Sequence, residues 1–290
     1  MASSGALRGI HVESVYSSQR MATRLDNIIA TTRATVAAAK GGVLVSDLER
    51  RAALHHPSRW AAALRRRAES EAAVIAEIKK SSPSKGLIRG NFDVKWLASR
   101  YEAGGAAALS VLTEGPHFQG SLKNLEIASA AVSLPCLRKD FMVDDYQFIE
   151  ARAHCADAIL LIAAALTSRE LKRFSDLAHS LELDVLVEVH TNCELDRVLD
   201  ALGANGADAI GVNNRDLKTF EVRMETSLEM ADRIPTQTVR VAESGIATSE
   251  DIARLRAAGF DAFLIGESLM RQPDPGDALA ELLAGSKVSG

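Results

Sequence analysis

From residue 73 onward, short apolar runs alternate with longer amphipathic segments along the chain. Each run predicts a buried strand, and each segment after it predicts a helix. Consecutive runs begin roughly 22 to 33 residues apart, which is the size of one βα unit. The predicted strands are 74–79, 107–113, 135–140, 158–163, 184–189, 209–213, 238–244 and 262–266.

Eight strands alternating with helices indicate a parallel sheet, because parallel neighbours need a long crossover connection. We therefore predict an α/β fold, a (β/α)8 TIM barrel formed by residues 73–290. No G-x-G-x-x-G motif follows the first strand, which counts against a doubly wound dinucleotide-binding sheet.

The segment before the barrel has a different pattern. Residues 1–21 are rich in Ser and Gly and lack periodicity, so we predict a disordered leader. Residues 22–72 predict an N-terminal helical extension that belongs to the same domain as the barrel. Its first helix should end near Gly41, its second should run from Ser46 to about Leu54, and its third should contain Trp60.

Composition limits the classes of function. The 290 residues carry a net charge of −4 with no basic stripe, which argues against nucleic acid as a partner. No apolar run approaches the ~20 residues of a membrane span, and no secretory signal is evident, so we expect a cytoplasmic protein without a membrane partner. Cys136, Cys155 and Cys193 are scattered and predict reduced thiols. The seven histidines show no metal-ligand spacing; we expect no metal and no cofactor, and interpret His190 as a structural histidine.

Charged residues end the odd-numbered strands. In a TIM barrel, side chains from alternate strands share one layer, and chemistry takes place at the C-terminal ends. The charges that should meet there are Glu77, Lys79, Lys139, Glu188 and Glu243. Each alone could be a structural ion pair, but five together favour a proton-transfer site. Schiff-base formation is the alternative use of such a lysine.

The last two strands end in small residues. Ser244 and Gly245 follow the seventh strand, and Gly266, Glu267 and Ser268 follow the eighth. Barrels commonly bind a phosphate there through backbone amides, although plain tight turns are the alternative.

Apolar side chains near the same end suit a flat aromatic ligand, with ordinary core packing as the alternative. They are Phe118, Phe141, Leu160 and Leu217.

With these residues assembled, the chain resembles the indole-3-glycerol phosphate synthase family over about residues 22–285. The resemblance rests on ordered motifs at successive strand ends: A-E-I-K-K-S-S-P-S-K-G, L-T-E-G-P-H-F-Q-G, L-R-K-D-F, L-V-E-V-H, G-V-N-N-R-D-L, V-A-E-S-G-I and L-I-G-E-S-L-M. It implies conversion of 1-(2-carboxyphenylamino)-1-deoxyribulose 5-phosphate to indole-3-glycerol phosphate, with loss of carbon dioxide and water. This is a carboxy-lyase reaction of tryptophan biosynthesis, by general acid/base catalysis. It also implies that the N-terminal helices help to cover the barrel mouth.

The resemblance assigns residues to two groups. The catalytic group is Glu77, Lys79, Lys139, Glu188, Asn213, Glu243 and Ser244. The substrate-binding group is Ser82, Phe118, Phe141, Leu160, Arg215, Leu217, Gly245, Gly266, the backbone of Glu267, and Ser268. Glu267 departs from family members that have a small hydroxyl residue there. The expected partner is a phosphorylated small molecule, and the expected state is a monomer, with a weak dimer as the alternative. Another phosphate-binding barrel enzyme and a non-enzymatic barrel are the competing hypotheses.

Overall fold

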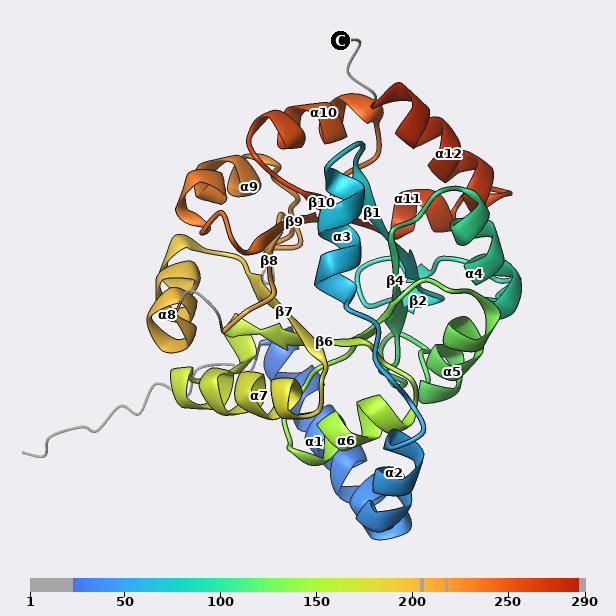
Figure 1. Ribbon diagram of the computed structural model, residues 1–290, viewed down its shortest axis with the longest axis vertical. Coiled ribbons are helices and arrows are strands. Elements are labelled where there is room, and N and C mark those ends of the chain that lie inside the picture. Colours follow the sequence, from blue (N-terminus) through green and yellow to red (C-terminus); the bar gives the residue numbers. More distant parts are fainter. Residues whose placement is uncertain (1–22, 204–205, 217–218, 287–290) are drawn as a thin grey trace, which may run out of the picture.

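Eight parallel strands close into a barrel, which confirms the predicted fold (Figure 1). The computed structural model describes residues 23–203, 206–216 and 219–286, so the predictions for residues 1–21 and for Leu217 lie outside the described residues. Around the barrel the strands follow chain order, and β10 pairs with β1 to close it. The barrel strands are β1 (Ala73–Ile78), β4 (Ala108–Leu112), β5 (Cys136–Lys139), β6 (Ala158–Ile162), β7 (Asp184–Val189), β8 (Ala209–Asn213), β9 (Val239–Glu243) and β10 (Ala262–Ile265).

Helices form an outer ring around these strands (Figure 1). A continuous apolar layer lies between the two, and the rings of Phe148 and Phe174 pack in it with centroids 5.0 Å apart. Helices α7 and α10 begin with reciprocal caps, in which Thr167 pairs with Glu170 and Thr248 with Asp251. The helical segments are α4 (Val94–Ala103), α5 (Leu122–Ala131), α6 (Tyr146–Ala153), η1 (Ala163–Ala165), α7 (Ser168–Ser180), α8 (Asn192–Leu202), α9 (Glu225–Met230), η2 (Ala231–Arg233), α10 (Ser249–Ala257), α11 (Glu267–Met270) and α12 (Pro275–Gly285).

Helix α3 (Trp60–Ala68) closes the barrel at the N-terminal ends of the strands. Trp60 and Leu64 are fully buried there against the lower interior of the barrel. The start of the helix is fixed because Asp184 Oδ2 accepts a hydrogen bond of 2.8 Å from the backbone N–H of Ala61. Part of the extension therefore lies opposite the mouth, whereas the resemblance implied that it covers the mouth.

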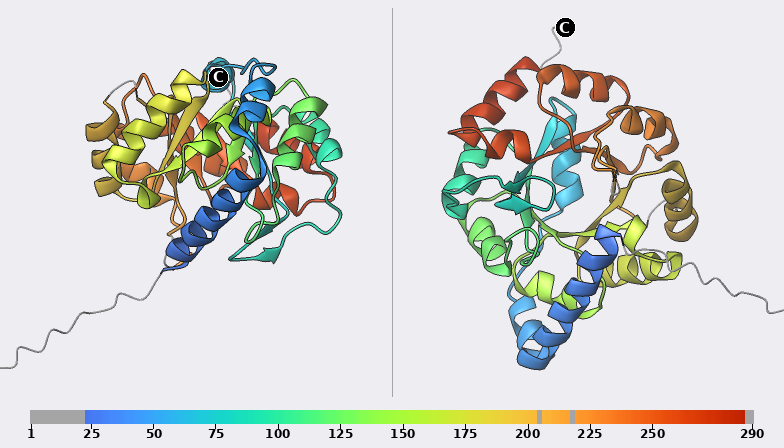
Figure 2. Two further views of the ribbon diagram at one scale, coloured as in Figure 1. Left: turned by 90° about the horizontal axis from the view of Figure 1, so that it is seen from below. Right: turned by 180° about the vertical axis from the view of Figure 1, so that it is seen from behind.

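Helix α1 (Arg24–Gly42) lies at the other end of the barrel, at the mouth (Figure 2). The short helix α2 (Val45–Ala52) then packs against α6 through Leu48 and Ala52. Among the described helices, no single one is long and apolar enough to cross a membrane; only α1 and α2 taken together, bent by 91°, meet the length and composition criteria.

A short hairpin follows β1, where the sequence pattern predicted no strand. Strand β2 (Ser81–Ser82) pairs antiparallel with β3 (Gly86–Leu87). Gly86 has φ 64°, a left-handed conformation that glycine adopts at little cost. The hairpin carries Ser82 to the mouth of the barrel.

Candidate active site

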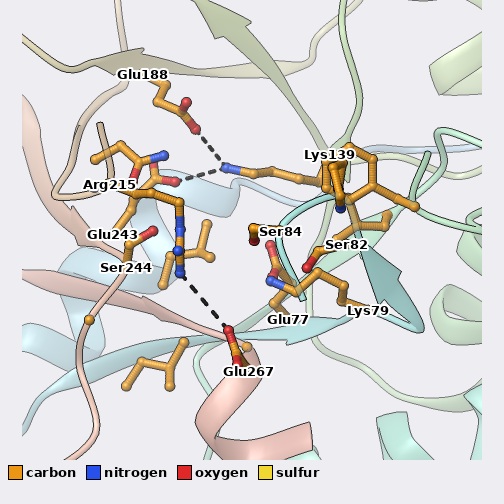
Figure 3. A pocket seen from close by; sticks show the side chains of 18 of the residues that line it. Glu77, Lys79, Ser82, Ser84, Lys139, Glu188, Arg215, Glu243, Ser244 and Glu267 are labelled. Atoms are coloured by element: carbon orange, nitrogen blue, oxygen red, sulfur yellow. Dashed lines mark hydrogen bonds and ion pairs between the residues drawn. The ribbon is translucent and has the colours of Figure 1, made fainter. Parts of the chain in front are cut away.

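A pocket of about 410 Å³ opens at the C-terminal ends of the strands. Its wall combines side chains from the strand ends with side chains from α1, β2 and the loops that follow the strands (Figure 3). Every predicted site residue that the structure describes lines it: Glu77, Lys79, Ser82, Phe118, Lys139, Phe141, Leu160, Glu188, Asn213, Arg215, Glu243, Ser244, Gly245, Gly266, Glu267 and Ser268. Their roles remain predictions.

Lys139 joins two buried carboxylates at the centre of the pocket. Its Nζ lies 2.9 Å from Glu188 Oε2 and 2.8 Å from Glu243 Oε2 (Figure 3). The three side chains come from β5, β7 and β9, as expected for a layer built from alternate strands. Glu188 is 4% exposed and Glu243 is 1% exposed, so water screens their charges weakly.

The two carboxylates differ in protonation. Burial alone would raise the pKa of Glu188, but Lys139 and His190 together outweigh burial and hold the pKa well below its usual range. Burial raises the pKa of Glu243 to about 7, and Lys139 only partly opposes it. Burial alone would lower the pKa of Lys139, but the two carboxylates outweigh it and raise the pKa above its usual range. The cluster therefore contains an ammonium, a carboxylate and a group that gains or loses a proton near neutral pH.

Glu77 and Lys79 form a second ion pair at the end of β1. Two glycines make room for the carboxylates: a Cβ on Gly266, directly after β10, would collide with Glu77, and a Cβ on Gly211, in β8, would collide with Glu243. Gly211 lies in β8, between the strands that carry Glu188 and Glu243. Gly211 was not among the predicted site residues, and its only sequence signal is a glycine within an apolar strand.

Backbone conformation shapes the turn after β9. Ser244 has φ 68° and Gly245 has φ 81°. The left-handed conformation is costly for serine, and it is held in place because the side-chain amide of Asn214 donates a 3.1 Å hydrogen bond to the carbonyl of Ser244. After β10, Gly266 precedes α11 without a side-chain cap, and Ser268 Oγ donates to the carbonyl of Ile246 at 3.2 Å. The two turns therefore contact each other at the pocket wall.

Aromatic side chains form another part of the wall. The rings of Phe118 and Phe141 have centroids 6.2 Å apart and are tilted by 41°. Glu114 organises the loop that carries Phe118, since its carboxylate accepts hydrogen bonds from the backbone N–H groups of His117 and Phe118 at 2.8 and 3.0 Å. Leu160 lies in the pocket wall as well. The pocket can therefore accommodate a flat apolar group beside its charged cluster.

Arg215 and Glu267 face each other across the pocket (Figure 3). Arg215 Nη2 lies 3.9 Å from Glu267 Oε2, a weak ion pair. Glu267 also pairs with Arg271 one turn further along the chain, at 3.1 Å. Asn213, in register with Glu243, accepts a hydrogen bond of 3.0 Å from the backbone N–H of Arg215.

Arg24 connects three segments at the mouth, and the sequence analysis did not find it. Its Nη2 donates a 2.6 Å hydrogen bond to the carbonyl of Pro83 in the β2–β3 hairpin. Its guanidinium lies 5.0 Å from the centroid of the Phe220 ring, a cation–π distance. The contacts of Arg24 have no sequence signal, because they join segments that are far apart in the chain.

His190 was interpreted as structural, yet its Nε2 lies 3.2 Å from Glu188 Oε1. The contact of His190 has no sequence signal because it depends on the orientation of the side chain.

The arrangement suits proton transfer to and from a bound anion with an aromatic part. No group of His, Cys, Asp and Glu side chains with the arrangement of a metal site occurs among the described residues. A charged lysine can stabilise negative charge that develops on an oxygen atom, and a carboxylate can accept a proton.

Comparisons with known proteins identify relatives of the chain. The model of a family described as indole-3-glycerol phosphate synthase matches residues 25–282. A protein named indole-3-glycerol phosphate synthase from Koribacter versatilis is 56% identical over 263 residues, which cover 91% of this chain and 100% of that protein. A protein of the same name from Chromobacterium violaceum is 48% identical over 264 residues, covering 90% of this chain and 98% of that protein.

Solved structures share the fold at low sequence identity. The 3-hexulose-6-phosphate synthase of Salmonella typhimurium aligns with a TM-score of 0.58 and 10% identity, over 74% of this chain and 98% of that one. A chain of the tryptophan synthase complex of Pyrococcus furiosus aligns with a TM-score of 0.54 and 13% identity, over 75% of this chain and 98% of that one. These similarities support the barrel alone.

Proposed function

The chain belongs to the indole-3-glycerol phosphate synthase family, and from this premise we propose how its pocket carries out the reaction. The activity is the conversion of 1-(2-carboxyphenylamino)-1-deoxyribulose 5-phosphate to indole-3-glycerol phosphate, a decarboxylating lyase reaction of tryptophan biosynthesis. A carbon–carbon bond forms between the ring carbon that bears the carboxylate and the ketone carbon. Carbon dioxide then leaves, which restores the aromatic ring, and water leaves last.

Lys139 serves the ring-closing step in this proposal. The ketone oxygen gains negative charge as the new bond forms, so a fixed cation beside it lowers the barrier. The position of Lys139 Nζ, 2.9 and 2.8 Å from two carboxylates at the centre of the pocket, is the single observation that carries the proposal. Lys79, paired with Glu77 at the wall, is assigned to the substrate anions.

Glu188 and Glu243 take different parts in the loss of water. That step needs a base to remove a proton from carbon and an acid to protonate the departing hydroxyl. Glu188 is the base, since Lys139 and His190 together hold its pKa well below the usual range and keep it ionised. Burial raises the pKa of Glu243 to about 7, so this group can carry a proton near neutral pH. It supplies protons through its contact with Lys139. Asn213 and Ser244, which lie beside Glu243 in sequence or in register, position the reacting oxygen.

Phosphate binding is assigned to the turns after β9 and β10. Gly245, Gly266 and the backbone of Glu267 and Ser268 expose amides on one side of the pocket. The Glu267 carboxylate pairs with Arg271 at 3.1 Å and lies 3.9 Å from Arg215, and these two cations offset its repulsion of the dianion. The carboxyphenyl ring is assigned to Phe118, Phe141 and Leu160, with Ser82 and Arg215 as polar contacts to its carboxylate.

A fluorescence assay tests the function directly. Purified protein with a chelator and no added cofactor should form the fluorescent indole product and release one carbon dioxide per product. The dephosphorylated substrate is the control, and its kcat/KM should fall at least about 100-fold, because charge-assisted hydrogen bonds to the phosphate are lost. A folded protein that forms no product would contradict the function. Equal kcat/KM for the two substrates would contradict the phosphate site alone.

Three further assignments complete the proposal. The extension and the barrel form one domain, because α1 lines the pocket and α3 packs in the barrel interior. The protein is cytoplasmic, as suits three unpaired thiols among the described residues. It is a monomer, which light scattering after size exclusion measures.

A further inference from the structure

His190 lies directly after β7 and its side chain is buried, with 7% of its surface exposed. Its Nε2 is 3.2 Å from Glu188 Oε1, and its Nδ1 is 3.4 Å from Glu194 Oε2 in the first turn of α8. The backbone N–H of His190 also donates a 2.7 Å hydrogen bond to Glu194 Oε2. The imidazole is therefore held between a carboxylate that faces the pocket and a carboxylate on the outer helix.

The surroundings of His190 favour its charged form. Burial alone would lower the pKa of His190, but its contacts with Glu188 and Glu194 outweigh burial and raise the pKa to about 10. On the outer side, the charge of Arg197 of α8 acts on Glu194. On the inner side, Lys139 of β5 and Glu243 of β9 complete the set of charges around Glu188.

Glu188 and Glu243 have nearly equal burial and nearly equal distances to Lys139. They differ on the second carboxylate oxygen. Glu188 Oε1 lies 3.2 Å from His190 Nε2, an ion-pair distance, although neither ring nitrogen of His190 makes a hydrogen bond among the described residues. Glu243 Oε1 has no hydrogen-bond partner within the described part of the chain. One carboxylate thus lies between two cations and the other contacts only one.

We propose that His190 is a positioning residue whose imidazolium orients the Glu188 carboxylate and keeps it ionised, so that Glu188 rather than Glu243 acts as the base. This rests on the proposed function, in which one carboxylate of the pair removes a proton. Of the two carboxylates that His190 contacts, only Glu188 lines the pocket, so His190 acts on the reaction through Glu188.

NMR on the protein tests the charge without any turnover. The ring nitrogens of His190, assigned by comparison with His190→Asn, should show an imidazolium from pH 6 to pH 8.5. The side-chain carboxyl carbon of Glu188 should remain ionised over the same range in the wild type. In His190→Asn it should titrate at a pH higher by about one unit or more, because a neighbouring opposite charge has been removed. A neutral His190 ring at pH 7, or an unchanged Glu188 titration, would overturn the proposal.

The pH dependence of turnover tests the consequence. In His190→Asn the acidic limb of the kcat profile should move to higher pH by about one unit or more, while KM stays near the wild-type value. His179→Asn is the matched control, since His179 contacts Asp208 at 2.9 Å on the outside of the barrel. It should leave the limb unchanged. A rate loss that is equal at every pH in His190→Asn would overturn the positioning role. If the wild type showed no turnover, the proposed function would be wrong. The NMR result would still decide the charge of His190.

Discussion

Arg138 and Lys139 are neighbours on β5, and each lies between two buried carboxylates on opposite faces of the strand. Arg138 faces outward toward α6 and pairs with Asp140 and Glu150 at 3.1 and 2.8 Å. Lys139 faces inward and pairs with Glu188 and Glu243 at 2.9 and 2.8 Å. By charge and burial alone, the two clusters are alike.

The two clusters differ in hydrogen bonding and in the space beside the cation: Arg138 does not line the pocket, and of its two partners only Asp140 does. The guanidinium of Arg138 also donates to Thr113 Oγ1 and to the carbonyl of Gln147, at 3.3 and 2.9 Å. Lys139 has a single side-chain nitrogen and faces a pocket of about 410 Å³. Glu243 Oε1 beside it has no hydrogen-bond partner among the described residues. A buried charge cluster therefore indicates chemistry only where a cavity adjoins it and one of its polar atoms lacks a hydrogen-bond partner. The outward cluster is structural, and we expect mutations to separate the two.

Lys139→Met should have the largest effect, on turnover. The rate should fall about 1,000-fold or more, because the cation beside the ketone oxygen is lost. Circular dichroism should show a retained fold, since Glu188 and Glu243 can share a proton once Lys139 is gone. The fluorescence assay measures the rate, and a variant with near-wild-type turnover would remove Lys139 from the mechanism.

Arg138→Met should act on stability instead. Removing one partner of a fully buried charge cluster costs about 3–5 kcal/mol, because two carboxylates are left without a cation. Turnover per folded molecule should remain close to that of the wild type. Thermal unfolding and the fluorescence assay at a temperature below both transitions measure the two effects. A folded, stable variant with lost turnover would show that the outward cluster is functional.

Glu243→Gln should have a smaller, pH-dependent effect on stability. Burial raises the pKa of Glu243 from 4.5 to about 7, so between these values the folded state binds a proton that the unfolded chain has lost. The stability contributed by Glu243 is present below pH 4.5 and falls as pH rises to about 7. The variant, which lacks this titration, should gain roughly 1–3 kcal/mol relative to the wild type between pH 5 and pH 8.

Calorimetry at pH 5 and pH 8 measures that gain as a difference in Tm between Glu243→Gln and the wild type. Glu188 and Lys139 do not obscure it, since their pKa values are displaced below and above their usual ranges and both stay charged over this interval. An equal difference at the two pH values would mean that Glu243 does not titrate there. Turnover should fall in the variant at both pH values.

The sequence pattern predicted most of the fold, because the alternation of a strand and the periodicity of a helix are both properties of short segments of the chain. Apolar runs with charged ends located the eight barrel strands to within a few residues. The position of these charges at the ends of odd-numbered strands predicted that Lys139, Glu188 and Glu243 meet, as they do in the structure. The β2–β3 hairpin was missed because its two-residue strands are too short for a pattern.

The sequence by itself determined the barrel, the family and the strand-end charges that face the pocket, since strand alternation and motif order are properties of the chain alone. Only the tertiary structure decided the contacts between elements. It placed α3 at the end of the barrel opposite α1, set Gly211 beside Glu243 and joined Arg24 to Pro83. It also separated Arg138 from Lys139 by what surrounds them, and placed the His190 ring against Glu188. Closure of the barrel and side-chain packing fix these contacts, and neither is encoded in the spacing of residues along one strand.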